Sequence, residues 1–428
     1  MKKIQNTLIA TALLCGAQAQ AANENATGLL VGKLVGETPM DQAWSAFNLY
    51  KDDTNPILQE FSLQGRFQLQ YADGHADTAK GDDQHFDISD VPHANNDNGI
   101  WDDHFEARRA RLGFKSKLFQ NWKFDGLINV DLDGEDNEGD NAFYRDIYDL
   151  YLTYAPADTF NMSAGKTKVR FSREQEISSN NILTFERSLL ANLLFPGELT
   201  GIWTSGKGVQ EYWLYELGVY GNDRVREFSE FDGGAIILGK VGYDYSSQAG
   251  LDSAIASFHY MHNTDAAYKP EKNLEFSNGT SPSFTDSIAL TNDITHGRYG
   301  LTTELLYGFG FDGKAEQENA PKTINQSDVF GITIIPSYFI ADGLQVVGRV
   351  QLATSSDKNG LSLPSRYESR ANNTTEGKNG NTYSSAYLGL NYYIHGHKLK
   401  LMNGVEYSHL GGGDYDGYTF LSGLRFSF

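Results

Sequence analysis

The chain has 428 residues, a formal net charge of −20, 13% aromatic residues and one cysteine. The negative charge argues against nucleic acid as a partner, because phosphate binding needs clustered positive charge. The aromatic content excludes a disordered chain. Beyond residue 21, no apolar run approaches the roughly 20 residues that a membrane-spanning helix needs. The 44 Gly, 24 Tyr and 25 Phe residues are typical of an all-β chain with many turns.

Residues 1–21 predict an export signal peptide. Lys2 and Lys3 supply the positive start, a mostly apolar stretch follows, and small residues at Ala19 and Ala21 suit cleavage. The apolar stretch is too short to span a bilayer. We therefore expect a signal peptide at 1–21, an N-terminal periplasmic segment at 22–58, and a single large domain from 59 to 428.

The N-terminal segment contains a predicted helix over residues 38–51. Thr38 is a suitable N-cap, and Pro39 follows at the first helical position. We expect the helix to pack on the periplasmic mouth of its own barrel, and an element that binds a partner is the alternative. Apolar residues recur at helical spacing at Met40, Ala43, Trp44 and Phe47.

The rest of the chain reads as strands in which apolar and polar residues alternate. Near the C-terminus, Phe420, Leu424 and Phe426 alternate with small or polar residues, which is the pattern of a lipid-facing barrel strand. A soluble sandwich also alternates, so one strand decides nothing. Sixteen strands are predicted near 59–72, 104–118, 122–132, 143–155, 160–171, 200–206, 211–221, 233–247, 253–263, 286–294, 298–310, 329–340, 344–355, 382–394, 399–410 and 418–428.

The connections between these strands alternate in length. Connections such as 119–121 and 341–343 hold three residues, whereas those between them are mostly long, as at 73–103 and 264–285. This asymmetry indicates an all-β, transmembrane antiparallel β-barrel with short periplasmic turns and long extracellular loops. A closed barrel leaves no sheet edge exposed to lipid. We therefore expect a protein of the outer membrane of a Gram-negative bacterium, in contact with lipid and lipopolysaccharide.

The negative charge belongs to the predicted outer loops. The eight long connections hold 34 acidic and 13 basic residues, a net of −21, and the remaining mature chain is nearly neutral. Such loops suit loose Ca²⁺ or Mg²⁺ binding that bridges to lipopolysaccharide phosphates. The acidic run at 131–135 lacks the spacing of an EF-hand loop, and no dedicated cofactor is predicted.

Basic residues gather in the first, second and fifth predicted strands. By alternation, Arg66 and four bases of the second strand face the lumen, because an arginine facing mid-bilayer lipid costs about 2–4 kcal/mol. Arg108 has the outward parity, so it is expected at the outer rim or against a neighbouring subunit. Solvated bases that merely pair with acidic loops are the alternative. The candidate pore-lining, anion-binding residues are Arg66, Arg108, Arg109, Arg111, Lys115, Lys117, Lys166, Lys168, Arg170 and Arg173.

The fifth strand leads into a long segment, 172–199, which is a candidate constriction loop inside the lumen. Phe160 and Met162 set an outward parity that Lys166 and Lys168 would continue. Gly165 is therefore a candidate bulge, or the point where the chain leaves the wall.

Several stretches between about 60 and 205 resemble the phosphate-selective porin O and P family. They are Phe61-Ser-Leu-Gln-Gly-Arg-Phe-Gln-Leu-Gln-Tyr71, Arg108-Arg-Ala-Arg-Leu-Gly-Phe114, Tyr148-Asp-Leu-Tyr-Leu-Thr-Tyr154, Ala164-Gly-Lys166 and Phe185-Glu-Arg-Ser188. The resemblance implies a trimeric outer-membrane channel with sixteen strands. It also implies that Arg66, Arg108 and Arg109 belong to the pore lining and that Lys166 starts the constriction loop.

One departure from that family bears on the solute. Its phosphate-specific members carry a lysine cluster in the N-terminal segment, whereas residues 22–58 here have only Lys33 and Lys51 against five acids. High-affinity phosphate binding is therefore not expected.

Three functions remain open, and none is enzymatic. The first is a passive porin for small hydrophilic solutes, with a basic constriction that favours phosphate or other small anions. The second is a general or cation-preferring porin governed by the acidic loops. The third is a structural or surface-adhesion barrel.

Overall fold

The computed structural model describes residues 36–78, 81–87, 105–130, 143–223, 225–231, 233–264, 284–310, 328–364, 367–368 and 379–428. The predicted signal peptide and the acidic run at 131–135 lie outside these residues.

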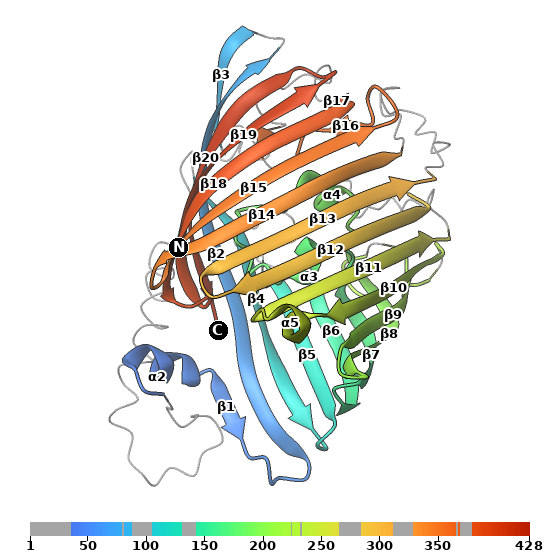
Figure 1. Cartoon of the computed structure of the whole chain (residues 1–428). Helices are drawn as coiled ribbons and strands as arrows, with labels where there is room; N and C mark the ends of the chain where they lie inside the picture. The colour runs from blue at the N-terminus through green and yellow to red at the C-terminus, as the bar shows by residue number, and fades with distance from the viewer. Residues whose placement is uncertain are drawn as a thin grey trace.

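Sixteen antiparallel strands close into one barrel, as the sequence predicts (Figure 1). Closure occurs at β2, which pairs with β4 along one edge and with β20 along the other. The wall strands are β2 (Leu58–Thr78), β4 (Phe105–Leu118), β5 (Trp122–Val130), β6 (Tyr144–Ala157), β7 (Phe160–Lys168), β8 (Glu198–Val209), β9 (Trp213–Gly221), β10 (Ala235–Asp244), β11 (Ser253–Asn263), β12 (Asp286–His296), β13 (Tyr299–Phe309), β14 (Val329–Ala341), β15 (Leu344–Ser355), β18 (Thr382–His395), β19 (Leu399–Gly411) and β20 (Tyr415–Ser427).

Short accessory elements extend the wall at its two ends. β1 (Asn48–Lys51) pairs with the start of β2, and β3 (Gly81–Asp87) pairs with its far end. β16 (Leu361–Ser362) pairs with β17 (Asn379–Gly380) within the connection from β15 to β18. The helical turn α5 (Ser246–Ala249) joins β10 to β11.

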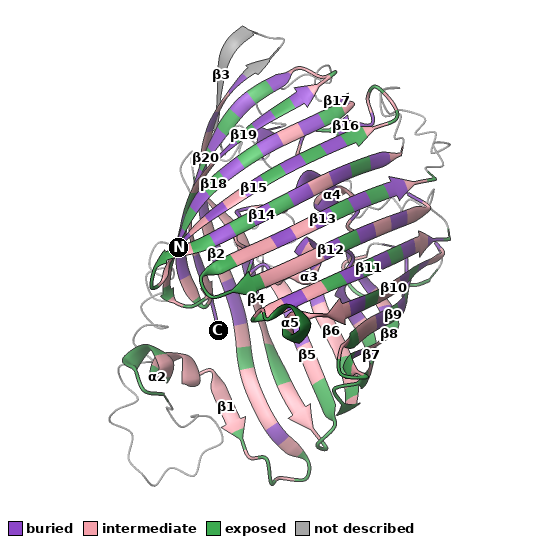
Figure 2. Cartoon of the chain, in the orientation of Figure 1, coloured by how far each residue is buried: buried purple, intermediate pink, exposed green. Residues whose placement is uncertain are grey.

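The outer surface of the wall is apolar and carries aromatic residues at both ends. Buried and exposed residues alternate along strands such as β14 (Figure 2). Exposed aromatic residues at the ends of the strands form two belts, which is typical of a barrel crossing a bilayer. No helix in the described ranges is long and apolar enough to cross a membrane. The belts comprise Trp122, Tyr154, Phe160, Trp213, Tyr299, Tyr338 and Tyr392 near the short turns, and Phe105, Tyr260, Tyr307, Phe330, Tyr407 and Tyr418 near the long loops.

The N-terminal helix is shorter than predicted. α2 spans Pro39–Ser45, capped by Thr38 as expected, but residues 48–51 are extended as β1. The extended conformation is favoured because Asn48 pairs with Ser62 of β2. This pairing covers the part of the β2 edge before Arg66, where the pairing with β20 ends.

Aromatic side chains join this N-terminal segment to the C-terminus. The Trp44 indole donates to the Ser427 carbonyl oxygen over 2.7 Å. The rings of Phe47 and Phe428 stack with centroids 3.9 Å apart. A Cβ at Gly65 would lie 2.2 Å from the Phe428 ring, so glycine leaves the room that this ring occupies. The segment therefore seals the junction where the barrel closes.

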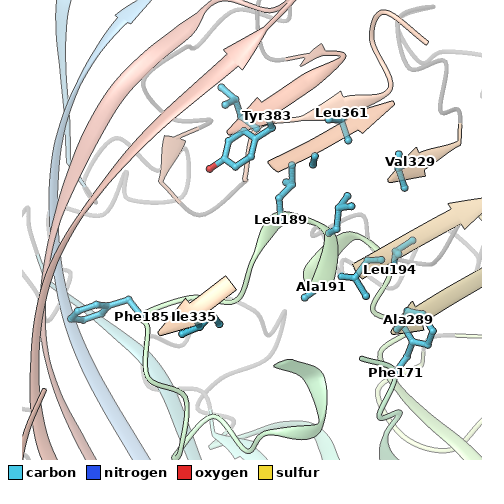
Figure 3. Packing of buried hydrophobic residues seen from close by; sticks show 14 of the residues in the cluster. Phe171, Phe185, Leu189, Ala191, Leu194, Ala289, Val329, Ile335, Leu361 and Tyr383 are labelled. Carbon is cyan, nitrogen blue, oxygen red and sulfur yellow. The ribbon is translucent and has the colours of Figure 1, made fainter. Parts of the chain in front are cut away.

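The hydrophobic core lies inside the barrel, where residues 169–197 fold into the lumen (Figure 3). This inner segment contains α3 (Arg173–Glu176) and α4 (Leu189–Leu193). Gly308 of β13 gives it room, because a Cβ there would lie 2.6 Å from Leu194. The packed residues labelled in Figure 3 are Phe171, Phe185, Leu189, Ala191 and Leu194 of the inner segment and Ala289, Val329, Ile335, Leu361 and Tyr383 around it.

Candidate functional site

The inner segment is tied to strands on several sides of the barrel. On β13, the Glu304 carboxylate accepts the backbone N–H of Glu174 over 3.0 Å. On β15, the Gln351 amide oxygen accepts the Leu189 N–H over 2.7 Å. On β19, the Lys400 ammonium donates to the Ile182 carbonyl over 2.7 Å. The inner segment is thus held inside the barrel, and it overlaps the range 172–199, whose role as a constriction loop stays a prediction.

One side of this constriction is lined by arginines of β2 and β4. Arg66 donates to the hydroxyls of Ser179 at 2.6 Å and Ser178 at 3.2 Å, both on the inner segment. Arg111 donates to the Asn129 side chain over 2.6 Å, and its guanidinium lies 3.4 Å from the centroid of the Tyr148 ring.

Two further cations reach the same place from β7 and the inner segment. Arg187 donates to the carbonyls of Glu174 at 2.6 Å and Ile177 at 2.8 Å. Burial lowers the pKa of the Arg187 guanidinium, and the charge of Arg111 acts in the same direction. The Lys168 ammonium is buried with no hydrogen-bond partner in the described part of the chain. Arg187 and Arg111 act on it electrostatically.

Arg425 of β20 and Arg109 of β4 complete the arrangement, since both donate to the Gln68 side chain. Arg425 also donates to the Phe185 carbonyl of the inner segment over 3.1 Å. We call the six side chains the basic cluster. Its members are held mainly by hydroxyls, amides and carbonyls, so most of their charge is not neutralised by carboxylates within the described residues. The basic cluster is Arg66, Arg109, Arg111, Lys168, Arg187 and Arg425.

The other side of the constriction is neutralised. Arg173 forms ion pairs with Asp293 at 2.7 Å and with Glu176 at 3.4 Å. Lys240 of β10 also pairs with Glu176. Arg170 is half-buried, and the negative charge of Glu216 acts on it electrostatically. Arg170 and Arg173 are therefore lumenal, as predicted, but their charges are compensated.

Arg108 faces the lumen, so the outward orientation that alternation gave is wrong, whereas the position among the pore-lining candidates that the family resemblance gave agrees with its contacts. Gln68 lies opposite Arg109 and Leu69 opposite Ala107, which leaves Arg108 as the extra residue of a β-bulge. A bulge turns two consecutive side chains to one side of the sheet. Arg108 therefore reaches the carboxylate of Glu186 on the inner segment, at 2.6 and 3.0 Å.

Lys166 does not line the pore, which corrects its predicted role. The register of β7 is regular through Gly165, so Lys166 keeps the outward parity of exposed Met162. Its ammonium donates to the carbonyls of Val225, over 2.5 Å, and Arg226, over 3.0 Å, which fold over the outside of β7. Lys166 pairs regularly with Leu150 of β6 and Thr200 of β8, so Gly165 does not form the bulge that would turn Lys166 toward the lumen.

The remaining predicted bases, Lys115 and Lys117, lie on β4 near the periplasmic mouth. Lys115 has the lumenal parity and pairs with Asp125 over 3.5 Å. It lines a cavity of about 350 Å³ together with Trp44, Arg66 and Asn180. Lys117 is half-buried and lies two residues nearer the periplasmic end of β4, opposite Lys123 of β5.

A second segment enters the lumen from the extracellular side. Tyr367 donates to the Glu106 carboxylate of β4 over 2.8 Å. Glu368 accepts from the hydroxyls of Tyr383 at 3.1 Å and Ser408 at 3.2 Å. The connection between β15 and β18 therefore contributes two buried residues to the mouth.

Prediction from sequence missed several lumenal cations. Lys240, Arg349, Lys400 and Arg425 are each the only Lys or Arg of their strand, and Arg187 lies within the segment that was predicted only as a loop. Alternation could have identified them, because Arg349 alternates along β15 with the lipid-exposed Val350 and Leu352.

No group of three or more His, Cys, Asp or Glu residues in the described ranges could hold a metal ion.

Comparison with known proteins agrees with this architecture. Residues 78–412 match the family "Phosphate-selective porin O and P". No curated protein has a significant match. The fold is similar to that of OmpF of Salmonella typhi in complex with daunomycin, with 12% identity, a TM-score of 0.54 and coverage of 89% of this chain and 99% of that one. The outer membrane channel DcaP of Acinetobacter baumannii is 17% identical, with a TM-score of 0.47 and coverage of 88% and 99%. The match covers most of the chain, which therefore belongs to the phosphate-selective porin O and P family and is an outer-membrane channel.

Proposed function

We propose that the protein is a passive diffusion channel whose basic cluster favours small anions such as chloride and phosphate. The observation that carries the proposal is the meeting of six cations at the point where the inner segment narrows the lumen, with mainly neutral hydrogen-bond partners. Fixed positive charge there replaces part of the hydration of a passing anion. Conduction also needs weak binding, because an ion that binds tightly does not leave.

A general or cation-preferring porin is the second candidate. It is favoured by the acidity of the outer loops, whose charge raises the local cation concentration at the entrance. Salt distinguishes the two, because exposed loop charges are screened within about 8 Å at physiological ionic strength, whereas charges at the constriction are screened less.

The experiment is the reversal potential of the purified protein in a planar bilayer under a KCl gradient. A potential near that of chloride supports the proposal, whereas one near that of potassium supports the cation-preferring alternative. Absence of conductance would favour a structural or adhesion protein.

The proposal includes a homotrimer in the outer membrane of a Gram-negative bacterium, in contact with lipopolysaccharide. The family match supports the location and the assembly. Cross-linking in native outer membranes tests the assembly, and a ladder ending at the dimer or monomer would count against it. Divalent cations at the acidic loops remain a proposal, tested by loop proteolysis with and without chelator.

A further inference from the structure

We propose that Glu186 is a specificity-determining residue, a carboxylate of the chain that permanently occupies an anion site built by Arg108 and Arg109. This inference rests on the proposed function and deepens it. The site is a bidentate oxyanion site, and its free form would take a carboxylate or phosphate group.

The geometry at Glu186 is that of a bound anion. Arg108 donates through Nε at 2.6 Å and through Nη2 at 3.0 Å, one to each carboxylate oxygen, and Arg109 Nη2 lies 3.7 Å from the second oxygen. Two parallel N–H···O bonds are the arrangement by which arginine recognises carboxylate and phosphate. Both partners are largely buried, with about a fifth of each side chain exposed for Arg108 and Glu186.

The backbone holds this carboxylate in place. The Glu186 carbonyl accepts from Arg349 over 2.5 Å and from the Thr184 hydroxyl over 2.8 Å. The bulge at Arg108 turns that side chain inward, so the pair requires both an irregular strand and a fixed inner segment. A tethered carboxylate at such a fixed position has a high effective concentration and competes with any solute anion for the same donors.

Charge balance shows what this occupant does to the pore. Glu186 is the carboxylate within ion-pair distance of the basic cluster in the described part of the chain, through Arg109. It also acts electrostatically on Arg425 and Arg187. With Glu186 in place, an anion meets a diffuse positive field and not a free arginine pair. The pore thereby keeps the weak binding that conduction needs.

The test is block of chloride current by inorganic phosphate in planar bilayers. Glu186→Gln removes the occupant's charge, and we expect phosphate to reach half-block at a concentration about tenfold lower than in the wild type, because a hydrogen-bonded charge contributes on that scale. Glu186→Asp keeps the charge and should retain most of the wild-type resistance to block. Asp293→Asn is the matched control, since it removes a carboxylate from the compensated pair with Arg173 on the other side.

The proposal is overturned if Glu186→Gln and Asp293→Asn change phosphate block equally. Folding is checked by the heat-dependent shift in gel mobility. Should Glu186→Gln not fold, Arg108→Gln tests the same pair in the opposite direction. It leaves Glu186 undercompensated and must raise the half-blocking concentration, and an unchanged value contradicts the inference. The wild-type reversal potential tests the proposed function separately, because the effect of Glu186 on phosphate block does not depend on the sign of that potential.

Discussion

Arg349 of β15 holds both Glu406 of β19 and the inner segment. Its Nη2 donates to the two Glu406 carboxylate oxygens at 2.8 and 2.9 Å, and its Nη1 donates to the Glu186 carbonyl at 2.5 Å. Arg349 is 2% exposed, so the pair is buried. One wall side chain thus anchors the inner segment, and Glu406 neutralises its charge.

Replacing Arg349 by Met is therefore expected to destabilise the folded barrel. Loss of one partner from a buried ion pair leaves an uncompensated charge and costs about 3–5 kcal/mol. The measurement is the temperature of the heat-dependent gel shift. Arg349→Met combined with Glu406→Gln should recover part of the loss. A single variant as stable as the wild type would show that the pair does not anchor the segment.

Removing one charge from the basic cluster should reduce anion preference. A unit charge about 8 Å from a passing ion in water interacts with it by about 0.5 kcal/mol, with opposite signs for anion and cation. Arg111→Gln is therefore expected to lower the anion-to-cation permeability ratio about fivefold. Reversal potentials in a KCl gradient measure the ratio.

Lys166→Gln is the matched control for that experiment. It removes the same charge from a residue that lies on the outward face of β7 under residues 225 and 226. We expect the reversal potential to stay at its wild-type value. An equal shift in Lys166→Gln and Arg111→Gln would contradict the orientation of β7 described above.

Docking of Glu368 into the lumen is expected to depend on pH. Burial raises the pKa of Glu368 to about 7 from an ordinary value of 4.5, and the charge of Glu406 adds to the rise. The hydroxyls of Tyr383 and Ser408 donate to Glu368, and Arg349 forms an ion pair with Glu406. Because the pKa of the carboxyl is higher in the docked state, docking becomes less stable as the pH rises from about 4.5 through about 7.

The extracellular connection carrying Glu368 should therefore be held more tightly at pH 5 than at pH 9. Single-channel recordings should show a larger, noisier conductance at pH 9. Glu368→Gln, which stays neutral, should remove the difference between the two pH values. If that variant retains the wild-type pH dependence, another group is responsible.

The junction sealed by the N-terminal segment gives a stability prediction. Trp44→Ala removes the hydrogen bond to Ser427 and the contact with the Phe426 ring, whose centroid is 5.6 Å away. We expect a loss of about 1–3 kcal/mol, measured by the heat-dependent gel shift. Met40→Ala, at an exposed position of α2, should have no effect. Equal behaviour of the two variants would mean that α2 does not stabilise the closure.

Period-two alternation together with the unequal connections predicted the barrel, and alternation gave the inward orientation of Arg66, Arg109, Arg111 and Lys115. It failed at Arg108, because one extra residue opposite Gln68 and Leu69 reverses parity and leaves no mark in the sequence. At Lys166 the alternation itself gave the outward orientation found in the structure, and the resemblance to a family position pointed the other way. The helix over 38–51 is shorter than predicted because Asn48 pairs with Ser62 at the start of β2.

The electrostatic character of the site could not be predicted in the same way. Whether a cation is free or neutralised depends on contacts across the lumen, as between Arg173 and Asp293 or between Arg108 and Glu186. Those pairs join residues 120 and 78 positions apart in the chain. Local patterns do not encode such distances.

In the proposed mechanism, the basic constriction outweighs the acidic loops in setting ion preference. The most direct test is the reversal potential across the wild-type protein under KCl gradients centred on low and high salt. The proposed mechanism predicts anion preference that persists at high salt, where loop charges are screened. Cation preference at both salt concentrations would contradict it.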